Sequence, residues 1–230
     1  MLCKIADLYA EIPEVGDLSS RLGSYKTEER CAADIVVREE RFKKERWPGI
    51  SGDPFFYLES GWHFYVKLVM HGGMMLHSSA VELLGKAYLF SGPPGMGKST
   101  HARLWTRIFP EARIFNDDKP AIRRIGNTHV AYGTPWCGKD GININTHAPI
   151  AGICFLKRGS KNEMRRLSKI EAASAILSQT ISNFKEPEQL SVLLGIIDGI
   201  IDTVPIYELK CTPDEEAARL SHRIMSGEVL

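Results

Sequence analysis

The stretch GPPGMGKST constrains the fold of this chain more than any other feature of its sequence. Its spacing is GxxxxGKS, given by Gly92, Gly97, Lys98 and Ser99. In such a loop, glycines let backbone N–H groups approach phosphate oxygens, the lysine reaches the β- and γ-phosphates, and the serine hydroxyl binds magnesium. The stretch therefore predicts a site for ATP and Mg²⁺ with these cofactor-binding residues: Gly92, Pro93, Pro94, Gly95, Met96, Gly97, Lys98, Ser99 and Thr100.

The sequence on either side of this loop has the pattern that a phosphate-binding loop requires. The apolar run KAYLFSG leads into the loop and predicts a strand. The run that leaves the loop predicts a helix, because four apolar residues recur in it at helical spacing: Ala102, Leu104, Trp105 and Ile108. A strand, a phosphate loop and a helix are thus expected in this order.

The composition excludes several classes of protein. With 29 Lys and Arg against 28 Asp and Glu, the chain lacks the positive excess of proteins that bind nucleic acid, so no such partner is expected. No run of about eighteen apolar residues occurs and the N-terminus is a poor signal peptide, so we expect no membrane span and a cytoplasmic location. The five cysteines are scattered and odd in number, which argues against a disulfide framework or a zinc site.

Strands are predicted on both sides of the phosphate loop. The runs PFFYLES and GWHFYVKLVM, rich in aromatic and β-branched residues, predict a pair of strands within residues 54–70. Further strands are predicted in SSAVEL, ARIFN, PAIRRI and HVAYG, and IAGICFLKR is typical of a central strand covered on both faces.

The C-terminal third predicts helices. Ser168 with Glu171, and Thr212 with Glu215, have capping-box spacing, and Pro213 would occupy the first position of the second helix. Between these two starts, an apolar stripe is expected to cover the sheet through Leu190, Leu193, Leu194 and Ile197.

These patterns predict an α/β fold with a mixed β-sheet. Residues 71–230 are expected to form an ATP-binding domain with covering C-terminal helices, and residues 1–70 a small β-rich accessory segment.

An acidic pair follows the phosphate loop by one helix. Asp117 and Asp118 end the short apolar strand ARIFN in the run RIFNDDKPAI. Two carboxylates at such a position can divide two tasks, one holding the metal ion on the phosphates and the other taking a proton from an attacking hydroxyl. A turn or helix-cap role is the alternative, and the upstream loop favours the catalytic interpretation.

Three other residues are weaker candidates. His77 begins a strand, where a lone histidine is more often a packed residue than a ligand. Lys139 lies in the glycine-rich stretch YGTPWCGKDGININ, which has a length suited to covering a site, and its charge could neutralise a transferred phosphoryl group. Cys137 in the same stretch has no partner histidine fixed by the sequence, so an incidental thiol is favoured over a nucleophile.

The order LHSSAVELLGKAYLFSGPPGMGKST, NDDKP and GTPWCGKDGIN resembles the HPr kinases and their serine-kinase-like relatives, within the PEP carboxykinase-like fold. The match covers roughly residues 73–160. In HPr kinases a histidine precedes the strand that feeds the phosphate loop, and an acidic pair follows one helix later. Their signature glutamate and arginine have no clear counterpart in TPWCGKD, so the resemblance does not imply HPr itself as the substrate.

Carried onto this sequence, the resemblance implies roles for single residues. Ser99 and Asp118 would hold the divalent ion, and Asp117 would be the general base. His77 would lie at the metal or phosphoryl site, which makes the predicted catalytic set Asp117, His77, Lys98 and Lys139. Because relatives often assemble into hexamers, a homo-oligomer is also implied.

The predicted function is an ATP- and Mg²⁺-dependent kinase that phosphorylates a hydroxyl of a protein, a peptide or a small molecule. In a protein or peptide, the expected acceptor is a serine. Two alternatives stay open from the sequence. One is an ATP-binding sensor or scaffold without chemistry, and the other is an ATPase that uses water as the acceptor. The paired aspartates favour the kinase over the scaffold, since a pure binder has no need of them.

Overall fold

The strand, loop and helix predicted around the phosphate motif are confirmed. In the computed structural model, which describes residues 1–184 and 186–227, β6 runs from Lys86 to Ser91 and α3 from Lys98 to Ile108. The loop between them carries the phosphate motif. Strand β5 (Ser78–Leu83) precedes β6 through the predicted turn at Leu84 and Gly85 and pairs with it antiparallel.

The remaining strands are β1 (Leu2–Ile5), β2 (Leu8–Glu11), β3 (Ile35–Val36), β4 (Gly73–Met75), β7 (Arg113–Asp118), β8 (Ala121–Ile125), β9 (Thr128–Tyr132), β10 (His147–Arg158), β11 (Glu163–Arg166) and β12 (Ile206–Cys211). The remaining α-helices are α1 (Leu18–Leu22), α2 (Gly52–Met70), α4 (Lys169–Ser178), α5 (Pro187–Thr203) and α6 (Glu215–Ser226).

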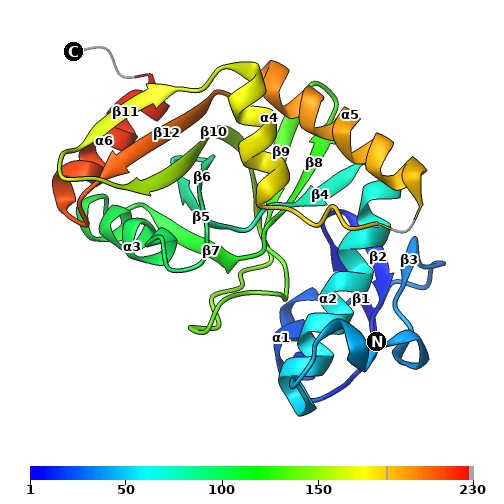
Figure 1. Cartoon of the computed structure of the whole chain (residues 1–230). Helices are drawn as coiled ribbons and strands as arrows, with labels where there is room; N and C mark the ends of the chain where they lie inside the picture. The colour runs from blue at the N-terminus through cyan, green and yellow to red at the C-terminus, as the bar shows by residue number, and fades with distance from the viewer. Residues whose placement is uncertain (185, 228–230) are drawn as a thin grey trace.

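A large mixed sheet forms the centre of the molecule, as the sequence predicts. Its strands follow the order β4-β8-β9-β10-β6-β5-β7, with β12 paired to β10 and β11 to β12 (Figure 1). The long strand β10 pairs antiparallel with β9 through its first residues and parallel with β6 and β12 through its later ones. The predicted central strand is therefore confirmed, with neighbours on both sides.

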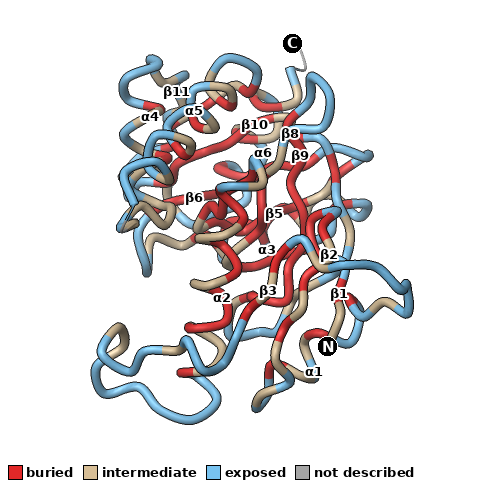
Figure 2. The backbone as a smooth tube through the Cα atoms, turned by 90° about the vertical axis from the view of Figure 1, so that its right-hand side faces the viewer, coloured by how far each residue is buried: buried red, intermediate tan, exposed pale blue. Residues whose placement is uncertain are grey.

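Helices cover both faces of this sheet. Apolar residues of α4 and α5, such as Ile176 and Ile197, share a core with Leu89 of β6 and Phe115 of β7. On the opposite face, Trp105 of α3 and residues of α6 pack against other side chains of β5 and β6. Figure 2 shows the sheet strands as the buried interior beneath more exposed helices and loops. The covering C-terminal helices expected from the sequence are present.

Residues 52–70 form helix α2, so the predicted strand pair within residues 54–70 is wrong. Buried residues recur every three to five positions along this segment, as at Phe55, Glu59, Phe64 and Leu68, which is the spacing of one helix face. Gly61 lies inside this helix, where a Cβ atom would lie 2.9 Å from the ring of Trp136. The aromatic content suggested strands, but it reflects packing of one helix face.

The remaining N-terminal residues include a small sheet, ordered β1-β2-β3. Its core is continuous with the rest of the molecule, because Ile5 and Leu22 belong to the same cluster of buried side chains as Tyr65 of α2 and Tyr132 of β9. This shared core fixes residues 1–70 against the sheet that carries the phosphate loop.

Two details of the C-terminal third differ from the prediction. The capping box of Ser168 with Glu171 is confirmed, but α6 begins with Asp214 as its N-cap, because the Asp214 carboxylate accepts a hydrogen bond from Ala217 N at 2.9 Å. The predicted cap at Thr212 and first position at Pro213 are therefore wrong. In the predicted stripe of α5, Leu193 and Ile197 are buried, whereas Leu190 and Leu194 are 38% and 47% exposed.

A buried histidine joins α3 to α6 and gives a testable pH dependence. His101 is 3% exposed and its Nε2 lies 2.9 Å from Ser221 Oγ. Burial lowers the pKa of His101 from 6.5 to about 4. Its folded pKa is below its unfolded pKa, so the stabilisation is present above pH 6.5 and is lost as the pH falls through 4. The loss between pH 7 and pH 4 should be about 3 kcal/mol.

Urea unfolding of wild type and His101→Gln at pH 7 and pH 4 measures this effect. Glutamine can still bond to Ser221 and does not titrate, so the stability of the variant should fall less with pH than that of the wild type. Equal pH dependence of the two proteins would show that His101 does not titrate as described.

Candidate active site at the ends of strands β5, β6 and β7

The phosphate loop has the backbone geometry that its glycines predict. Gly92, Gly95 and Gly97 adopt φ angles of +146°, +76° and +98°, a region that favours glycine. Lys98 begins α3, and its Nζ donates to the carbonyl of Gly92 at 2.9 Å, so the ammonium group lies over the loop. No acidic side chain occupies the first turn of α3, which leaves the positive end of the helix available to phosphate.

Strand β5 brings His77 to this loop. Its first residue, Ser78, pairs with Ser91 at the end of β6 and with Asp118 at the end of β7. His77 precedes Ser78 directly, and its carbonyl accepts a hydrogen bond from Ser91 Oγ at 2.8 Å. The start of β5 thus lies between the strand that enters the phosphate loop and the strand that ends in the acidic pair.

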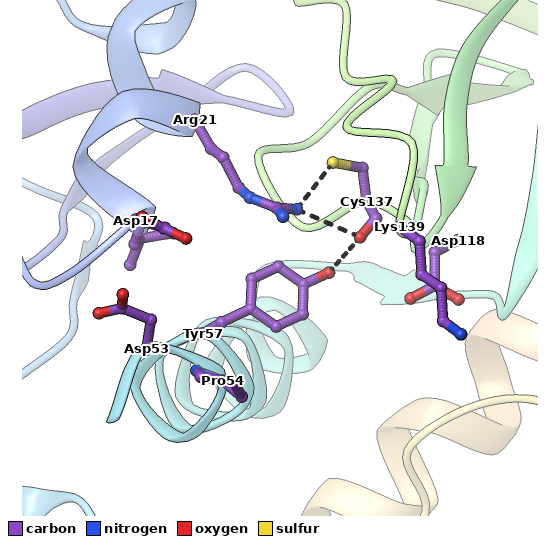
Figure 3. Close-up of a pocket in the computed structure, with 10 residues that line it drawn as sticks. Asp17, Arg21, Asp53, Pro54, Tyr57, Asp118, Cys137 and Lys139 are labelled. Carbon is purple, nitrogen blue, oxygen red and sulfur yellow. Dashed lines mark hydrogen bonds between the residues drawn. The ribbon is translucent and has the colours of Figure 1, made fainter. Parts of the chain in front are cut away.

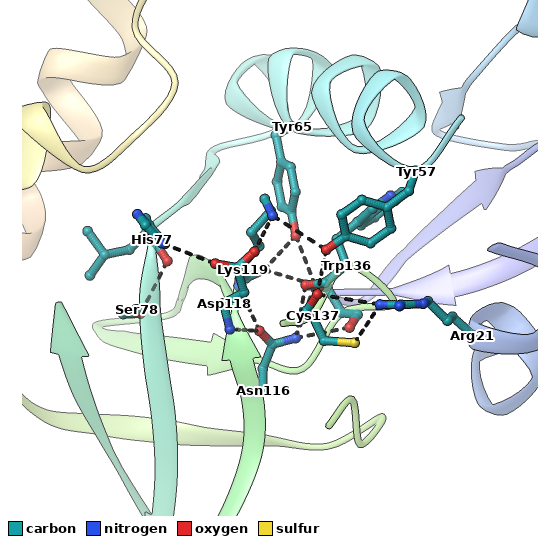
Figure 4. Close-up of polar contacts among 12 residues, drawn as sticks. Arg21, Tyr57, Tyr65, His77, Ser78, Asn116, Asp118, Lys119, Trp136 and Cys137 are labelled. Carbon is teal, nitrogen blue, oxygen red and sulfur yellow. Dashed lines mark hydrogen bonds and ion pairs between the residues drawn. The ribbon is translucent and has the colours of Figure 1, made fainter. Parts of the chain in front are cut away.

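Asp118 is held between two basic side chains. His77 Nε2 lies 3.1 Å from Asp118 Oδ1, and the Lys119 ammonium forms an ion pair with the other carboxylate oxygen (Figure 4). Burial by itself would raise the pKa of Asp118, but the hydrogen bond from His77 and the charge of Lys119 lower that pKa to about 2. The carboxylate is therefore ionised at neutral pH and available to a cation.

Asp117 has a different environment from its neighbour. It is 5% exposed, and Ser79 Oγ of β5 donates a hydrogen bond to Asp117 Oδ1 at 2.5 Å. Burial lowers the pKa of Lys98, and the charges of Asp118 and Asp117 oppose that shift, so the lysine and the acidic pair lie within electrostatic reach of each other. The two carboxylates thus occupy different settings, as a division of tasks requires.

Sequence reasoning missed two residues beside the acidic pair. Asn116 is fully buried; its amide donates to the carbonyl of Thr134 at 2.9 Å, and its Oδ1 accepts from Lys119 N at 2.8 Å. Asn116 thereby fixes the turn that follows Asp118. Lys119 directly follows the acids in NDDKP, and this adjacency was the available signal for its ion pair.

The glycine-rich stretch after β9 packs against the end of β7. A Cβ atom on Gly138 would lie 2.5 Å from the carbonyl of Asp117, and one on Gly133 would lie 1.9 Å from that of Ile144. Only glycine allows these close approaches. Lys139 follows Gly138, is exposed, and lines a cavity next to Asp118.

This cavity has a volume of about 410 Å³ and lies between the glycine-rich stretch and the N-terminal segment (Figure 3). One wall contains Asp118, Cys137, Gly138 and Lys139, and the wall from the N-terminal segment contains Asp17, Leu18, Arg21, Asp53, Pro54 and Tyr57. The second wall could not be predicted, because nothing in the sequence of residues 1–70 indicates contact with the phosphate motif.

Contacts from the N-terminal segment hold the glycine-rich stretch at Cys137. The Tyr57 hydroxyl donates to the Cys137 carbonyl at 2.7 Å, and Arg21 Nη1 lies 3.1 Å from Cys137 Sγ. Lys119 Nζ lies 3.4 Å from the same Tyr57 hydroxyl, so a chain of contacts runs from Arg21 to Asp118. Burial raises the pKa of Cys137, which supports the interpretation of an incidental thiol.

The residues predicted to bind magnesium supply suitable donors. Hydroxyl and carboxylate oxygens are the ligands that Mg²⁺ prefers, and Ser99 and Asp118 provide one of each. Within residues 1–184 and 186–227, no group of three His, Cys, Asp or Glu side chains could hold a metal ion. ATP phosphate oxygens and water would therefore complete the coordination, as is usual for Mg²⁺.

The structure thus brings the predicted loop, His77, Asp117 and Asp118 together at one end of neighbouring strands, with Lys139 beside them. No family model matches the chain, and no curated protein matches it. Among solved structures, the chain is similar to "Structure of the Hpr(Ser) kinase/phosphatase from Coxiella burnetii", at 12% identity, over 66% of this chain and 99% of that one, with a TM-score of 0.38. The site is therefore described from the chain's own residues.

Along the described part of the chain, no helix combines the length and the apolar character needed to cross a membrane.

Proposed function

We propose that this chain is a kinase that transfers the γ-phosphoryl group of ATP to a hydroxyl group, with Mg²⁺ as cofactor. The observation that carries the proposal is the joint position of three features. The phosphate loop, the acidic pair Asp117–Asp118 and His77 meet where β5 begins and β6 and β7 end, next to a cavity that can admit a second substrate. A protein that only binds a nucleotide requires neither the acids nor the cavity.

Each residue has a role in the proposed reaction. Asp117 takes the proton from the acceptor hydroxyl, whose oxygen forms a bond to the γ-phosphorus as the bond to the β-phosphate oxygen breaks and ADP leaves. Lys98 neutralises charge on the phosphates, and Lys139 does so from the acceptor side. Ser99 and Asp118 would hold Mg²⁺, which would neutralise phosphate charge, while His77 orients the Asp118 carboxylate.

In this proposal the acceptor enters the cavity of about 410 Å³ beside Asp118 and Lys139. That volume is within the range of pockets for small ligands, about 300–1,000 Å³. The acceptor is a small molecule, a peptide or an exposed protein segment that carries a hydroxyl. Residues 71–230 would be the ATP-binding part, and residues 1–70 would supply one wall of the acceptor cavity.

Labelled ATP tests the proposal. The protein is incubated with a lysate of the organism that produces it and with ATP labelled in either the γ- or the α-phosphate. The proposal expects a labelled acceptor with γ-label and none with α-label. Release of free phosphate alone would indicate a hydrolase, and nucleotide binding without turnover would indicate a sensor or scaffold.

Lys119→Met tests the positioning of Asp118. Removing the ammonium group leaves the carboxylate held by His77 alone, and misplacement of about 1 Å can cost about 10²-fold in rate. We therefore expect phosphoryl transfer to fall by about 10- to 100-fold. Lys169→Met is the matched control, since Lys169 also forms an ion pair, with Asp202, but on the exposed surface of α4. Equal rates for the two variants would contradict a role for Lys119.

A further inference from the structure

A second cavity lies on the other side of the phosphate loop from the acidic pair. Strand β6, which feeds the loop, has β5 on one side and β10 on the other. His77 and Asp118 belong to the β5 and β7 side. The second cavity, of about 330 Å³, is built where β10 and β12 end and α3 begins, and its walls include Met96, Thr100 and Cys211.

The orientation of ATP in the proposed function selects this side for the nucleoside. The γ-phosphate must point toward Asp117 and Asp118, where transfer occurs. The α- and β-phosphates lie against the loop and the N-terminus of α3. The nucleoside must then leave the loop away from the acidic pair, past the first turn of α3. Thr100 and His101 place this turn in the wall of the second cavity.

A larger groove of about 820 Å³ also touches the loop but fits the nucleoside less well. It meets the loop at Gly92, Pro93 and Met96 and contains no residue of α3. It also extends to Gln179, whose carbonyl accepts a hydrogen bond from His77 N at 2.8 Å and thus lies at the reacting end of the site. Its wall also carries ion pairs, because Glu171 and Glu208 both pair with Arg165 there, and so offers a charged surface to a base.

The second cavity has a lining that suits an uncharged aromatic base. Leu104 and Leu156 provide apolar walls, and among the described residues no carboxylate side chain lines the cavity. Arg158 lines both this cavity and the larger groove, and its Nη2 donates to the Gly95 carbonyl of the loop at 3.3 Å. Arg158 forms no ion pair with a carboxylate in the described part of the chain, so its charge is available to a phosphate.

We infer that this cavity binds the nucleoside of the phosphoryl donor, with Arg158 facing the phosphate chain. The inference rests on the proposed function, because that function sets the direction of the triphosphate. It assigns the donor side of the site to residues of α3, β10 and β12, opposite the acceptor cavity that the N-terminal segment closes.

Cysteine footprinting tests the inference without knowledge of the acceptor. Cys211 lines the cavity and is partly exposed. Cys31 is exposed and does not line the cavity, and the other three cysteines are buried. The protein is treated with N-ethylmaleimide, and modification of Cys211 and Cys31 is followed by peptide mass spectrometry. Parallel samples contain Mg-ADP or Mg-tripolyphosphate, which supplies phosphates without a nucleoside.

The inference expects saturating Mg-ADP to slow modification of Cys211 by at least about tenfold, since bound nucleoside would cover a cavity of this kind. Mg-tripolyphosphate should leave Cys211 reactive, and Cys31 should react equally in all samples. Equal protection by both ligands, or binding of Mg-ADP without protection, would overturn the inference while leaving the proposed function intact. Failure of Mg-ADP to bind at all, measured by thermal shift, would instead reject the proposed function together with it.

Mg-ADP could also protect Cys211 by binding elsewhere and changing the conformation of the cavity, and a substitution at Cys211 distinguishes this case. Cys211→Trp fills the cavity with an indole ring. It should weaken Mg-ADP binding by about tenfold or more, because the base would lose its space, and leave Mg-tripolyphosphate binding unchanged. Equal affinities of wild type and variant for Mg-ADP would place the nucleoside elsewhere.

Discussion

Replacing Asp117 by asparagine is expected to lower phosphoryl transfer to the acceptor by about 10²- to 10⁴-fold, the usual contribution of a general base. Asparagine keeps the shape of the side chain and can still bond to Ser79, but it cannot take a proton. Binding of Mg-ATP should change little, because Lys98, Ser99 and Asp118 remain. The rate of label transfer from γ-labelled ATP to the acceptor measures the first effect, and a nucleotide titration measures the second.

Asp202→Asn is the matched control for this substitution. Asp202 lies on α5, is half exposed, and forms an ion pair with Lys169. Loss of its charge should leave the rate of transfer unchanged. If the Asp117→Asn variant transfers phosphate as fast as this control, Asp117 is not the general base.

Replacing Glu59 by alanine is expected to destabilise the protein by about 3–5 kcal/mol, the cost of breaking a buried ion pair. The Glu59 side chain is fully buried in α2. It accepts hydrogen bonds from Lys43 N at 2.7 Å and Trp47 Nε1 at 2.8 Å and forms an ion pair with Arg46. Alanine would leave these groups without their acceptor. Urea unfolding at pH 7 measures the loss of free energy of unfolding.

Glu45→Ala is the control for this effect, because Glu45 is an exposed acid in the same segment. A substitution at such a surface position usually changes stability by less than about 0.5 kcal/mol. A loss at Glu59 no greater than at Glu45 would show that the network does not fasten residues 43–47 to α2. Because α2 also carries Tyr57, this network supports the wall of the acceptor cavity.

The phosphate loop and its flanking strand and helix were predictable because their signals are local. Glycine spacing, the apolar run before Gly92 and the helical pattern after Lys98 each depend on neighbours in sequence. Asp117 and Asp118 were found for the same reason, as a pair at a strand end. The positions of these elements in the structure agree with those predictions.

Other features depend on contacts between distant residues and could not be read from the chain. Arg21 and Cys137 lie 116 positions apart and meet only because the N-terminal segment shares a core with the sheet. Helix α2 differs from the predicted strand pair because its aromatic residues pack as part of a helix, and one of the residues it packs against, Trp136, is distant in sequence.

The fate of the γ-phosphoryl group in water enriched in ¹⁸O distinguishes a kinase from an ATPase. The protein, Mg-ATP and the acceptor-containing extract are combined in this water, and phosphate esters and free phosphate are analysed by mass spectrometry. Direct transfer predicts a new phosphate ester without ¹⁸O, formed together with ADP and lost in Asp117→Asn. If the γ-phosphoryl group appears only as free phosphate that contains ¹⁸O, at the same rate with and without the extract, water is the acceptor and the chain is not a kinase.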